Sequence, residues 1–337
     1  MVTVTADLDV PLSQLTTLGD AKDYSGLVRA TLPTSGISSP IEAAVQSLPT
    51  TVVSHDLSGD TSVTVVSTDR VIAMDISGSI AATIAGLGLL DSLVARDIST
   101  TFDQVAELPV ITSNAHTVNS EAILALRPDL VVTDGSIGPI DVVLQLRDAG
   151  IPVVFVDTEP SVEGVAELAR QTADALGVSG AGDALGEMLS AEIEAKIAEI
   201  AEIVPAGDRL RMMFLYLRGT SGVYYLFGKE SGSDVLINAL GGVDVAAEIG
   251  LTGMRPMTDE AMVAANPDLI LVMTNGLASV GGVSGLLEAR PAVALTEAGK
   301  HQRFVEMDDG EILSFGPRTV TVLDALARAI YAPGSGS

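Results

Sequence analysis

The sequence contains no cysteine, which excludes disulfides, thiolate metal sites and a cysteine nucleophile. Basic residues are scarce too, because 18 Lys and Arg face 44 Asp and Glu, for a net charge of -26. Such a chain repels phosphate backbones, and no basic cluster overcomes this locally, so nucleic acid is not an expected partner. There is also no run of about 18 apolar residues, so no transmembrane helix is predicted.

Catalytic signatures are missing as well. The sequence has no H-E-x-x-H, no G-x-S-x-G and no Walker A motif, and the G-x-G that begins at Gly86 has Asp91 in place of the third glycine. We therefore expect a protein that is not an enzyme.

Aromatic residues are few and unevenly placed. The chain has no Trp, 5 Tyr and 6 Phe. One short stretch holds five of them, namely Phe214, Tyr216, Tyr224, Tyr225 and Phe227. Within it, FLYLRG (214–219) puts Tyr216 at the end of an apolar strand, two positions before Arg218. This clustering indicates a site.

Strand and helix signals alternate from about residue 70 to the end, the pattern of an α/β protein with mainly parallel strands. With 337 residues, 47% of them hydrophobic, the chain can form one large or two ordinary domains. A long amphipathic helix is predicted over 183–204. The expected buried strands are 71–74, 130–134, 153–157, 212–217, 269–273 and 303–308.

An internal repeat divides the chain into two similar halves. SEAILALRPDLVVT (120–133) matches DEAMVAANPDLILV (259–272), and RVIAMDISG (70–78) matches RMMFLYLRG (211–219). The segment SGSIAATIAGLG (77–88) matches SGSDVLINALGG (231–242) only after an insertion, TSGVYYLFGKESG, whose aromatics and glycines predict a β-hairpin.

Two similar lobes joined by one helix are expected to bind a ligand at the carboxyl ends of their strands, in a cleft. The predicted segments are an N-terminal extension or tether (1–67), an N-terminal lobe (68–160), a stretch with the interlobe helix (161–205), a C-terminal lobe (206–333) and a flexible tail (334–337).

Two loops at equivalent places are expected to flank the cleft mouth. His116, one of three histidines, lies in a polar loop before the first copy of the matching helix, and Arg255 is its equivalent. Alone, His116 is also compatible with a solvated or capping role. Tyr216 is likewise compatible with a buried aromatic whose hydroxyl finds a backbone partner.

Arg218 favours a different role for Tyr216. A guanidinium beside a phenol favours the phenolate, a hard ligand for ferric iron. Histidine from one lobe and tyrosinate from the other would give a six-coordinate haem site. Met273 ends its strand at the same rim, where it is either near the ligand or core filler.

Glu121 and Glu260 occupy equivalent positions in the matching helices. One interpretation is that they complement the helix macrodipole. The other is that they are a pair of docking points on one face.

The stretches NSEAILALRPDLVV, MTNGLASVGGVSGLL and ILSFGPRTV resemble periplasmic-type substrate-binding proteins of ATP-driven importers. The resemblance covers about residues 68–332, and it is strongest to the HmuT-type haem-binding lipoproteins of corynebacteria and related actinobacteria. It implies the class III periplasmic-binding-protein fold: α/β, with two Rossmann-like lobes whose central sheets are flanked by helices, joined by one long interlobe helix. Little lobe movement is then expected.

The resemblance also implies roles for individual residues. His116 and Tyr216 fall on the axial haem ligands, Arg218 on the arginine that hydrogen-bonds the tyrosine, and Met273 on a methionine near the haem. Met254 departs from the family, because relatives often have a tyrosine after this glycine, so a hydrogen bond near His116 is expected to be absent. Arg255 is a candidate for the propionates.

Partners and location are implied in the same way. Glu121 and Glu260 fall on the acidic pair that docks onto arginines of the permease. The expected partners are haem, the permease and ATPase of a haem importer, and upstream cell-surface haem-binding proteins, with the chain itself a monomer. The expected location is extracytoplasmic, lipid-anchored to the cell membrane through a cysteine that is not in this sequence. The alternatives are a ferric-siderophore or cobalamin carrier and, from another class, a haem-degrading enzyme.

Overall fold

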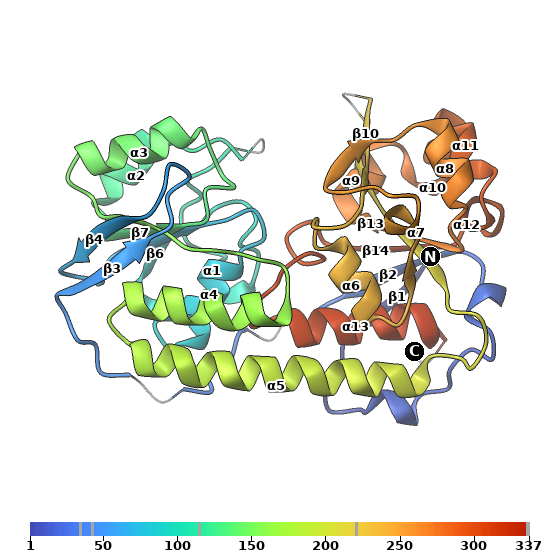
Figure 1. The fold of residues 1–337 in the computed structure, drawn as a ribbon, viewed down its shortest axis with the longest axis horizontal. Coiled ribbons are helices and arrows are strands. Elements are labelled where there is room, and N and C mark those ends of the chain that lie inside the picture. The colour runs from blue at the N-terminus through green and yellow to red at the C-terminus, as the bar shows by residue number, and fades with distance from the viewer. Residues whose placement is uncertain (34–35, 42–43, 114–115, 220–221, 335–337) are drawn as a thin grey trace. The chain divides into compact units, whose positions relative to one another are not determined.

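Two units, each built on its own sheet, make up the chain (Figure 1). The computed structural model describes residues 1–33, 36–41, 44–113, 116–219 and 222–334. Unit 1 comprises Met1–Pro33, Glu194–Leu313 and Val320–Ser337, and unit 2 comprises Thr34–Ile193 and Ser314–Thr319.

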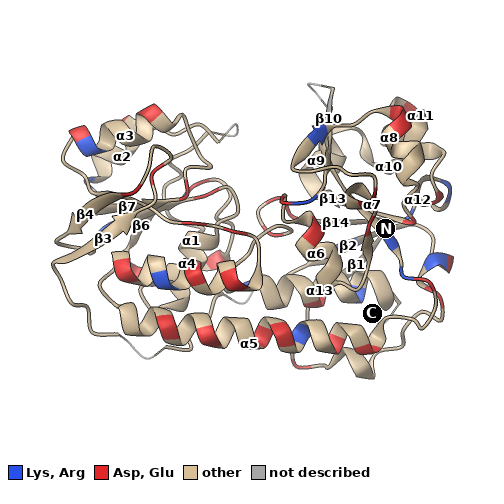
Figure 2. Cartoon of the chain, viewed as in Figure 1, with Lys and Arg blue, Asp and Glu red and all other residues tan. Residues whose placement is uncertain are grey.

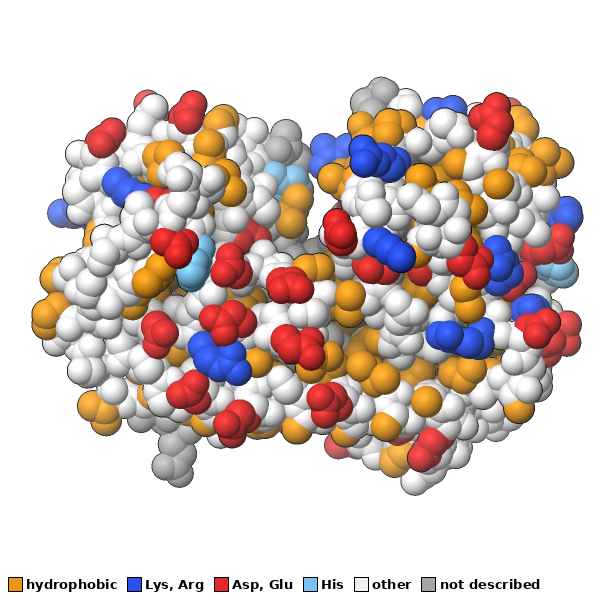
Figure 3. All heavy atoms as spheres, in the orientation of Figure 1, with side chains coloured by type: hydrophobic (Ala, Val, Ile, Leu, Met, Phe, Trp, Pro, Cys, Tyr) orange, Lys and Arg blue, Asp and Glu red, His pale blue; other side chains and the backbone are white. Residues whose placement is uncertain are grey.

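The boundary between the units falls inside helix α5 (Ser179–Ile203), which confirms the long helix predicted over 183–204. Leu185, Leu189, Ile193 and Ile200 are buried along one stripe of this helix. Acidic side chains recur along its length (Figure 2). They belong to a surface on which acidic side chains outnumber basic ones in the view of Figure 3, as the net charge of -26 requires.

Unit 2 contains a parallel sheet in the order β6-β5-β7-β8. Its strands are β5 (Val71–Met74), β6 (Leu93–Ala95), β7 (Leu130–Thr133) and β8 (Val153–Phe155). Its helices are α1 (Ser79–Gly86), η3 (Leu90–Ser92), η4 (Asp103–Val105), α2 (Ser120–Leu126), α3 (Ile140–Asp148) and α4 (Val162–Ala175). Every residue of β5, β7 and β8 is buried, which explains why these strands are continuous apolar runs in the sequence.

A hairpin of β3 (Thr50–Ser54) and β4 (Thr61–Val65) also belongs to unit 2. The Arg147 guanidinium of α3 pairs with Asp56 in the hairpin turn, at 2.5 Å from Nη1 to Oδ2. The amide of Phe155 in β8 donates to the Ser54 hydroxyl at 2.8 Å. These contacts attach the hairpin to the parallel sheet.

Unit 1 contains an eight-stranded sheet in the order β1-β2-β14-β13-β9-β10-β12, with β11 paired to β9. Its strands are β1 (Val2–Thr5), β2 (Leu27–Thr31), β9 (Arg211–Arg218), β10 (Val223–Phe227), β11 (Val243–Asp244), β12 (Met254–Pro256), β13 (Leu269–Met273) and β14 (Phe304–Met307). Its helices are η1 (Leu12–Gln14), η2 (Ala21–Asp23), α6 (Ser233–Ala239), α7 (Val245–Glu248), α8 (Asp259–Ala265), α9 (Thr274–Ser279), α10 (Gly282–Ala289), α11 (Pro291–Ala294), α12 (Glu297–His301) and α13 (Thr319–Tyr331).

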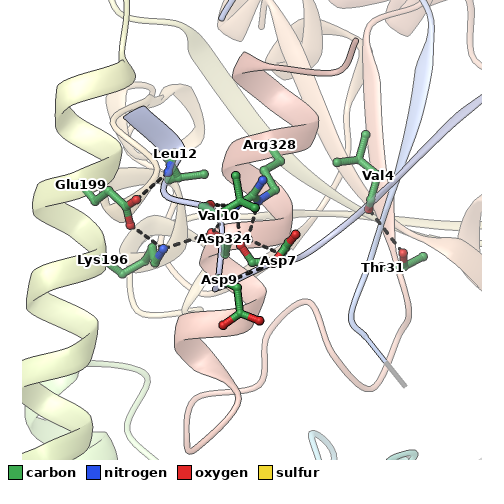
Figure 4. A network of polar contacts seen from close by, with 10 residues as sticks. All are labelled: Val4, Asp7, Asp9, Val10, Leu12, Thr31, Lys196, Glu199, Asp324 and Arg328. Carbon is green, nitrogen blue, oxygen red and sulfur yellow. Dashed lines mark hydrogen bonds and ion pairs between the residues drawn. The ribbon is translucent and has the colours of Figure 1, made fainter. Parts of the chain in front are cut away.

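The N-terminal residues are an integral part of unit 1. β1 pairs with β2, and β2 pairs with β14, all in parallel. The segment after β1 is bonded to two helices. The amide of Leu12 donates to Glu199 of α5 at 2.6 Å, and the amide of Asp7 donates to Asp324 of α13 at 3.0 Å (Figure 4). Asp324 is fully buried and pairs with both Lys196 and Arg328.

The domain boundaries therefore differ from those expected. Residues 1–33 are part of unit 1 and the β3–β4 hairpin is part of unit 2, whereas the sequence predicted an extension over 1–67. In this region β2 pairs with the distant β14, and the β3–β4 hairpin is attached to the sheet through Ser54 and Asp56, long-range contacts that local periodicity does not reveal. In the tail predicted over 334–337, residues 335–337 lie outside the described residues.

The predicted repeat has matching geometry in the two units. Asn119 caps α2 by accepting from the amide of Ala122, and Thr258 caps α8 by accepting from that of Ala261. A left-handed residue directly follows each helix, Arg127 after α2 and Asn266 after α8. In each unit a buried strand follows, β7 or β13.

The insertion forms the predicted hairpin. β10 pairs antiparallel with β9, with Tyr225 opposite Tyr216 and Phe227 opposite Phe214. Residues 220 and 221 of the insertion lie outside the described residues.

Candidate functional site

An aromatic face gathers around Tyr216 in unit 1. Side chains alternate along β9, so Phe214 and Tyr216 share one face while Met213, Leu215 and Leu217 enter the core on the other. The ring centroids of Phe214 and Phe227 are 5.1 Å apart, and those of Tyr216 and Phe227 are 5.8 Å apart, both stacked. Phe214 and Phe227 are buried, whereas Tyr216 is only partly buried. Phe227 of the insertion and Phe214 of β9 thus form a buried aromatic base beside a partly exposed tyrosine.

Arg218 directs its guanidinium at Tyr216. Its Nε donates to the Tyr216 hydroxyl, and its Cζ lies 5.6 Å from the centre of the Tyr216 ring. Arg218 is exposed, and its charge also acts on Asp309, a partly buried carboxyl group. Burial raises the pKa of Asp309, while the Arg218 charge acts in the opposite direction. The hydrogen bond between Arg218 and Tyr216, which the family resemblance implies, is present, and it is possible because residues two apart on a strand point to the same side.

Met273 lies beside Tyr216 on this face. In the register of β13 on β9, Leu271 pairs with Phe214 and Val272 with Leu215, which puts Met273 level with Tyr216 at the carboxyl ends of the strands. Met273 is partly buried.

Met254 and Arg255 lie on β12, at the edge beyond the hairpin. Met254 pairs with Phe227 and is 60% exposed, so it extends the aromatic face. Arg255 is exposed and pairs with Leu226, a core residue, so the register directs it to the face opposite Tyr216. Its expected role toward propionates stays a prediction that this register does not favour.

His116 belongs to unit 2, in the loop before α2. It has a left-handed backbone (φ 55°), and its amide donates to the carbonyl of Ser113 at 2.9 Å. Its Nδ1 lies 3.4 Å from the hydroxyl of Ser99. The side chain is partly buried. The structure therefore groups Tyr216, Arg218, Met273 and Met254 in one unit and places His116 in the other.

Two carboxyl groups are buried in the same unit as the His116 loop, and their burial was not predicted from the sequence. Asp75 follows β5 and Asp97 follows β6, and both are fully buried. Burial, together with the charges of Asp134 and Asp97, raises the pKa of Asp75 to about 7. Burial raises the pKa of Asp97 to about 6, although several hydrogen bonds act in the opposite direction. The available signal was an aspartate within two residues of the end of each apolar strand.

Asp75 also explains a difference between the two halves. Its carboxylate accepts from the amides of Ser79 at 2.8 Å and Ile80 at 3.1 Å, so it caps the first turn of α1. In the repeat, the equivalent of Asp75 is Tyr216, and the insertion separates it from α6. The position that caps a helix in unit 2 is thereby available for a different chemistry in unit 1.

Glu121 and Glu260 are both exposed in the first turns of α2 and α8. An exposed apolar residue follows each of them one turn later, Leu124 at 42% and Val263 at 47%. Both features recur at equivalent positions, as the repeat predicts.

Neither a membrane-spanning helix nor a cluster of metal ligands is found among the described residues. No helix among them is long and apolar enough to cross a membrane. In the same part of the chain, no three His, Asp or Glu side chains come together as a metal site.

Comparisons with known proteins point to one family. The sequence profile of the periplasmic binding protein family matches residues 75–310. A crystal structure of the heme binding protein HmuT has a TM-score of 0.85 and 38% identity, covering 93% of this chain and 99% of that chain. This similarity agrees with the expected class III fold.

Two curated relatives are more distant. An uncharacterized ABC transporter substrate-binding lipoprotein of Bacillus subtilis is 28% identical over 247 residues, which is 73% of this chain and 75% of the relative. A cobalamin-binding protein of Halobacterium salinarum is 27% identical over 266 residues, 78% of this chain and 69% of the relative. These matched proteins are ligand-binding proteins of the transport type and are not enzymes, as the sequence predicted.

Proposed function

Because the chain belongs to the periplasmic binding protein family, we propose that it is the substrate-binding protein of an ATP-driven importer and that its cargo is haem. The observation that carries this proposal is the Tyr216–Arg218 pair on an aromatic face. A phenol that receives a guanidinium hydrogen bond is suited to bind ferric iron as phenolate. The similarity to HmuT supports the same cargo.

Tyr216 and His116 are the proposed axial ligands. Tyrosine and histidine both serve as haem ligands in proteins. Structures of HmuT include variants in which a histidine, a tyrosine or an arginine is replaced by alanine, and that tyrosine and arginine are two positions apart, as are Tyr216 and Arg218. This spacing supports the assignment of Tyr216.

The aromatic face supplies the remaining affinity. Met254 and Met273 present apolar and polarisable surface beside Tyr216, and the buried Phe227 ring packs against Tyr216. Removing apolar macrocycle surface from water contributes roughly 25 cal/mol per Å². Ligation by Tyr216 then adds selectivity for a macrocycle that carries iron.

The proposed partners are a membrane permease and its ATPase, and Glu121 and Glu260 are the proposed docking points for the permease. Both carboxylates are exposed and lie at equivalent positions of the two units. Paired contacts suit a partner that offers two similar basic surfaces. The proposed location is extracytoplasmic, with the chain held at the membrane by a lipid anchor, in line with the lipoprotein relative.

A hemin titration tests the cargo and the ligands together. Wild type, His116→Ala and Tyr216→Ala are mixed with hemin, and the visible and EPR spectra are recorded. We expect a six-coordinate spectrum for wild type and a five-coordinate one for each variant, with the greater loss of affinity for Tyr216→Ala. If neither substitution alters the Soret region, the ligand assignment is wrong.

Cobalamin is the competing cargo, because one relative is a cobalamin-binding protein. Titration with cyanocobalamin in the same buffer distinguishes the two. Tight cobalamin binding that survives Tyr216→Ala, together with weak hemin binding, would replace the haem proposal.

A further inference from the structure

Ser99 connects the His116 ring to the buried interior of unit 2. The Ser99 hydroxyl lies 3.4 Å from His116 Nδ1. Ser99 is only 5% exposed, so its position is set by packing and hydrogen bonds. The two residues are 17 positions apart and belong to different loops of the same unit.

Asp97 fixes Ser99 in turn. One carboxylate oxygen of Asp97 accepts from the amide of Ser99 at 2.8 Å, from the amide of Thr100 at 2.8 Å and from the Thr100 hydroxyl at 3.0 Å. The other oxygen accepts from the amide of Asp75 at 3.0 Å, at the end of β5. The loop that carries Ser99 is therefore attached to the sheet through a fully buried carboxyl group.

We propose that Ser99 is a positioning residue for His116, whose Nδ1–H donates to the Ser99 hydroxyl so that Nε2 is left to bind iron. This inference rests on the proposed function. A histidine that binds a metal usually donates its other ring N–H to an oxygen acceptor, which fixes both tautomer and ring orientation.

The backbone contacts of His116 fix its position but do not orient its ring. The bond from the His116 amide to Ser113 and the left-handed φ hold the Cα position, but they do not restrict rotation about the side-chain bonds. A contact at Nδ1 restricts that rotation. Since Ser99 belongs to the same unit as His116, the restriction exists before haem arrives, which lowers the ordering cost of binding.

The tautomer can be measured without haem. The chain has three histidines, so the ¹⁵N-histidine NMR spectrum of the full apo protein contains three ring systems. We expect His116 to be protonated at Nδ1 in wild type and to shift toward the Nε2-protonated form in Ser99→Ala. A wild-type His116 protonated at Nε2 overturns the proposal.

The haem complex gives a second readout. We expect Ser99→Ala to bind haem through Tyr216 but to show a larger five-coordinate fraction in the visible and EPR spectra. Haem transfer to apomyoglobin should be about tenfold faster, the lower end of what such supporting contacts contribute to metal affinity. Ser99→Thr keeps the hydroxyl and should restore both properties, and it replaces Ser99→Ala as the informative variant if the latter does not fold.

Thr100→Val is the matched control. Thr100 is equally buried and bonds the same oxygen of Asp97, but its hydroxyl has no contact with His116 among the described hydrogen bonds. We expect its spectra to match wild type. Equal changes in Thr100→Val and Ser99→Ala would attribute the effect to the loop as a whole and overturn the proposal.

The outcomes separate this inference from the proposed function. If wild type binds no haem, the proposed function fails. If wild type binds haem and His116→Ala leaves the spectrum unchanged, the assignment of His116 as a ligand fails, and the role of Ser99 fails with it. If His116→Ala changes the spectrum and Ser99→Ala does not, only the positioning role of Ser99 fails.

Discussion

A guanidinium next to a phenol changes what that phenol can bind, so Arg218 is the residue on which the chemistry of Tyr216 depends. We expect Arg218→Ala to lower haem affinity by about 10- to 100-fold, since it removes both a charged donor and a stacked cation from Tyr216. Hemin titration monitored at the Soret band measures this.

Arg290 is a matched control for Arg218. It stacks on Tyr224, with its Cζ 3.9 Å from the ring centre, but Tyr224 belongs to the core on the other face of the sheet. Arg290→Ala should leave haem affinity near that of wild type. Equal losses in both variants would mean that general destabilisation, and not the Tyr216 contact, is the cause.

At single positions, the sequence predicts the contacts that local geometry determines. The alternation of strand residues puts Arg218 on the same side as Tyr216, and that contact is present. The contact between Ser99 and His116 was not predicted, because it joins two irregular loops whose approach depends on how Asp97 folds its own loop. The face of the sheet on which Arg255 lies was not predicted either, since the register of β12 determines it.

Among the elements, the N-terminal segment depends on buried charges. Lys196 of α5 is 8% exposed and bonds Asp324 of α13, with 3.0 Å between Nζ and Oδ1. Lys196→Met leaves Asp324 and Glu199 without this cation, so we expect the free energy of unfolding to fall by about 3 kcal/mol. Urea denaturation measures this change, and faster proteolysis within residues 1–33 should accompany it.

A surface lysine, Lys300, provides the control for Lys196→Met. Lys300 pairs with Glu297 in an exposed turn of α12, where water screens both charges. Lys300→Met should leave the urea midpoint unchanged. A loss of the same size in both variants would contradict the special role of the buried network.

The strength of the local sequence pattern determines which elements could be predicted. The helix α5, the strands β7 and β13 and the hairpin of β9 with β10 each have a strong local pattern or a repeat partner. β1 and β2 have only four and five residues, and β2 pairs with β14, so their pattern is short and their partner distant. Their place in unit 1 depends on long-range pairing and not on a local signal.

For the whole molecule, the effect of the net charge on a binding partner differs from the effect of a charge at a particular position. A net charge of -26 gives a field that acts on any charged partner at long range and weakens with salt. Because acidic side chains recur along α5 and elsewhere, most of them cannot mark a specific contact. The repeat identifies Glu121 and Glu260, since each unit has one exposed carboxylate at the same place, with an exposed apolar residue one turn later.

Double charge reversal tests this position dependence. Glu121→Lys with Glu260→Lys should reduce haem uptake by roughly tenfold or more in cells that carry the importer, because two opposite-charge contacts become repulsive. Haem affinity of the purified variant should not change, since both carboxylates are exposed in the first turns of their helices and neither is among the described contacts of Tyr216 or His116. Glu187→Lys with Glu202→Lys is the control: both are exposed residues of α5, one in each unit, and the net charge changes equally. If the control variant loses uptake to the same extent, the long-range field alone explains docking; if the Glu121 and Glu260 variant keeps full uptake, these carboxylates are not docking points.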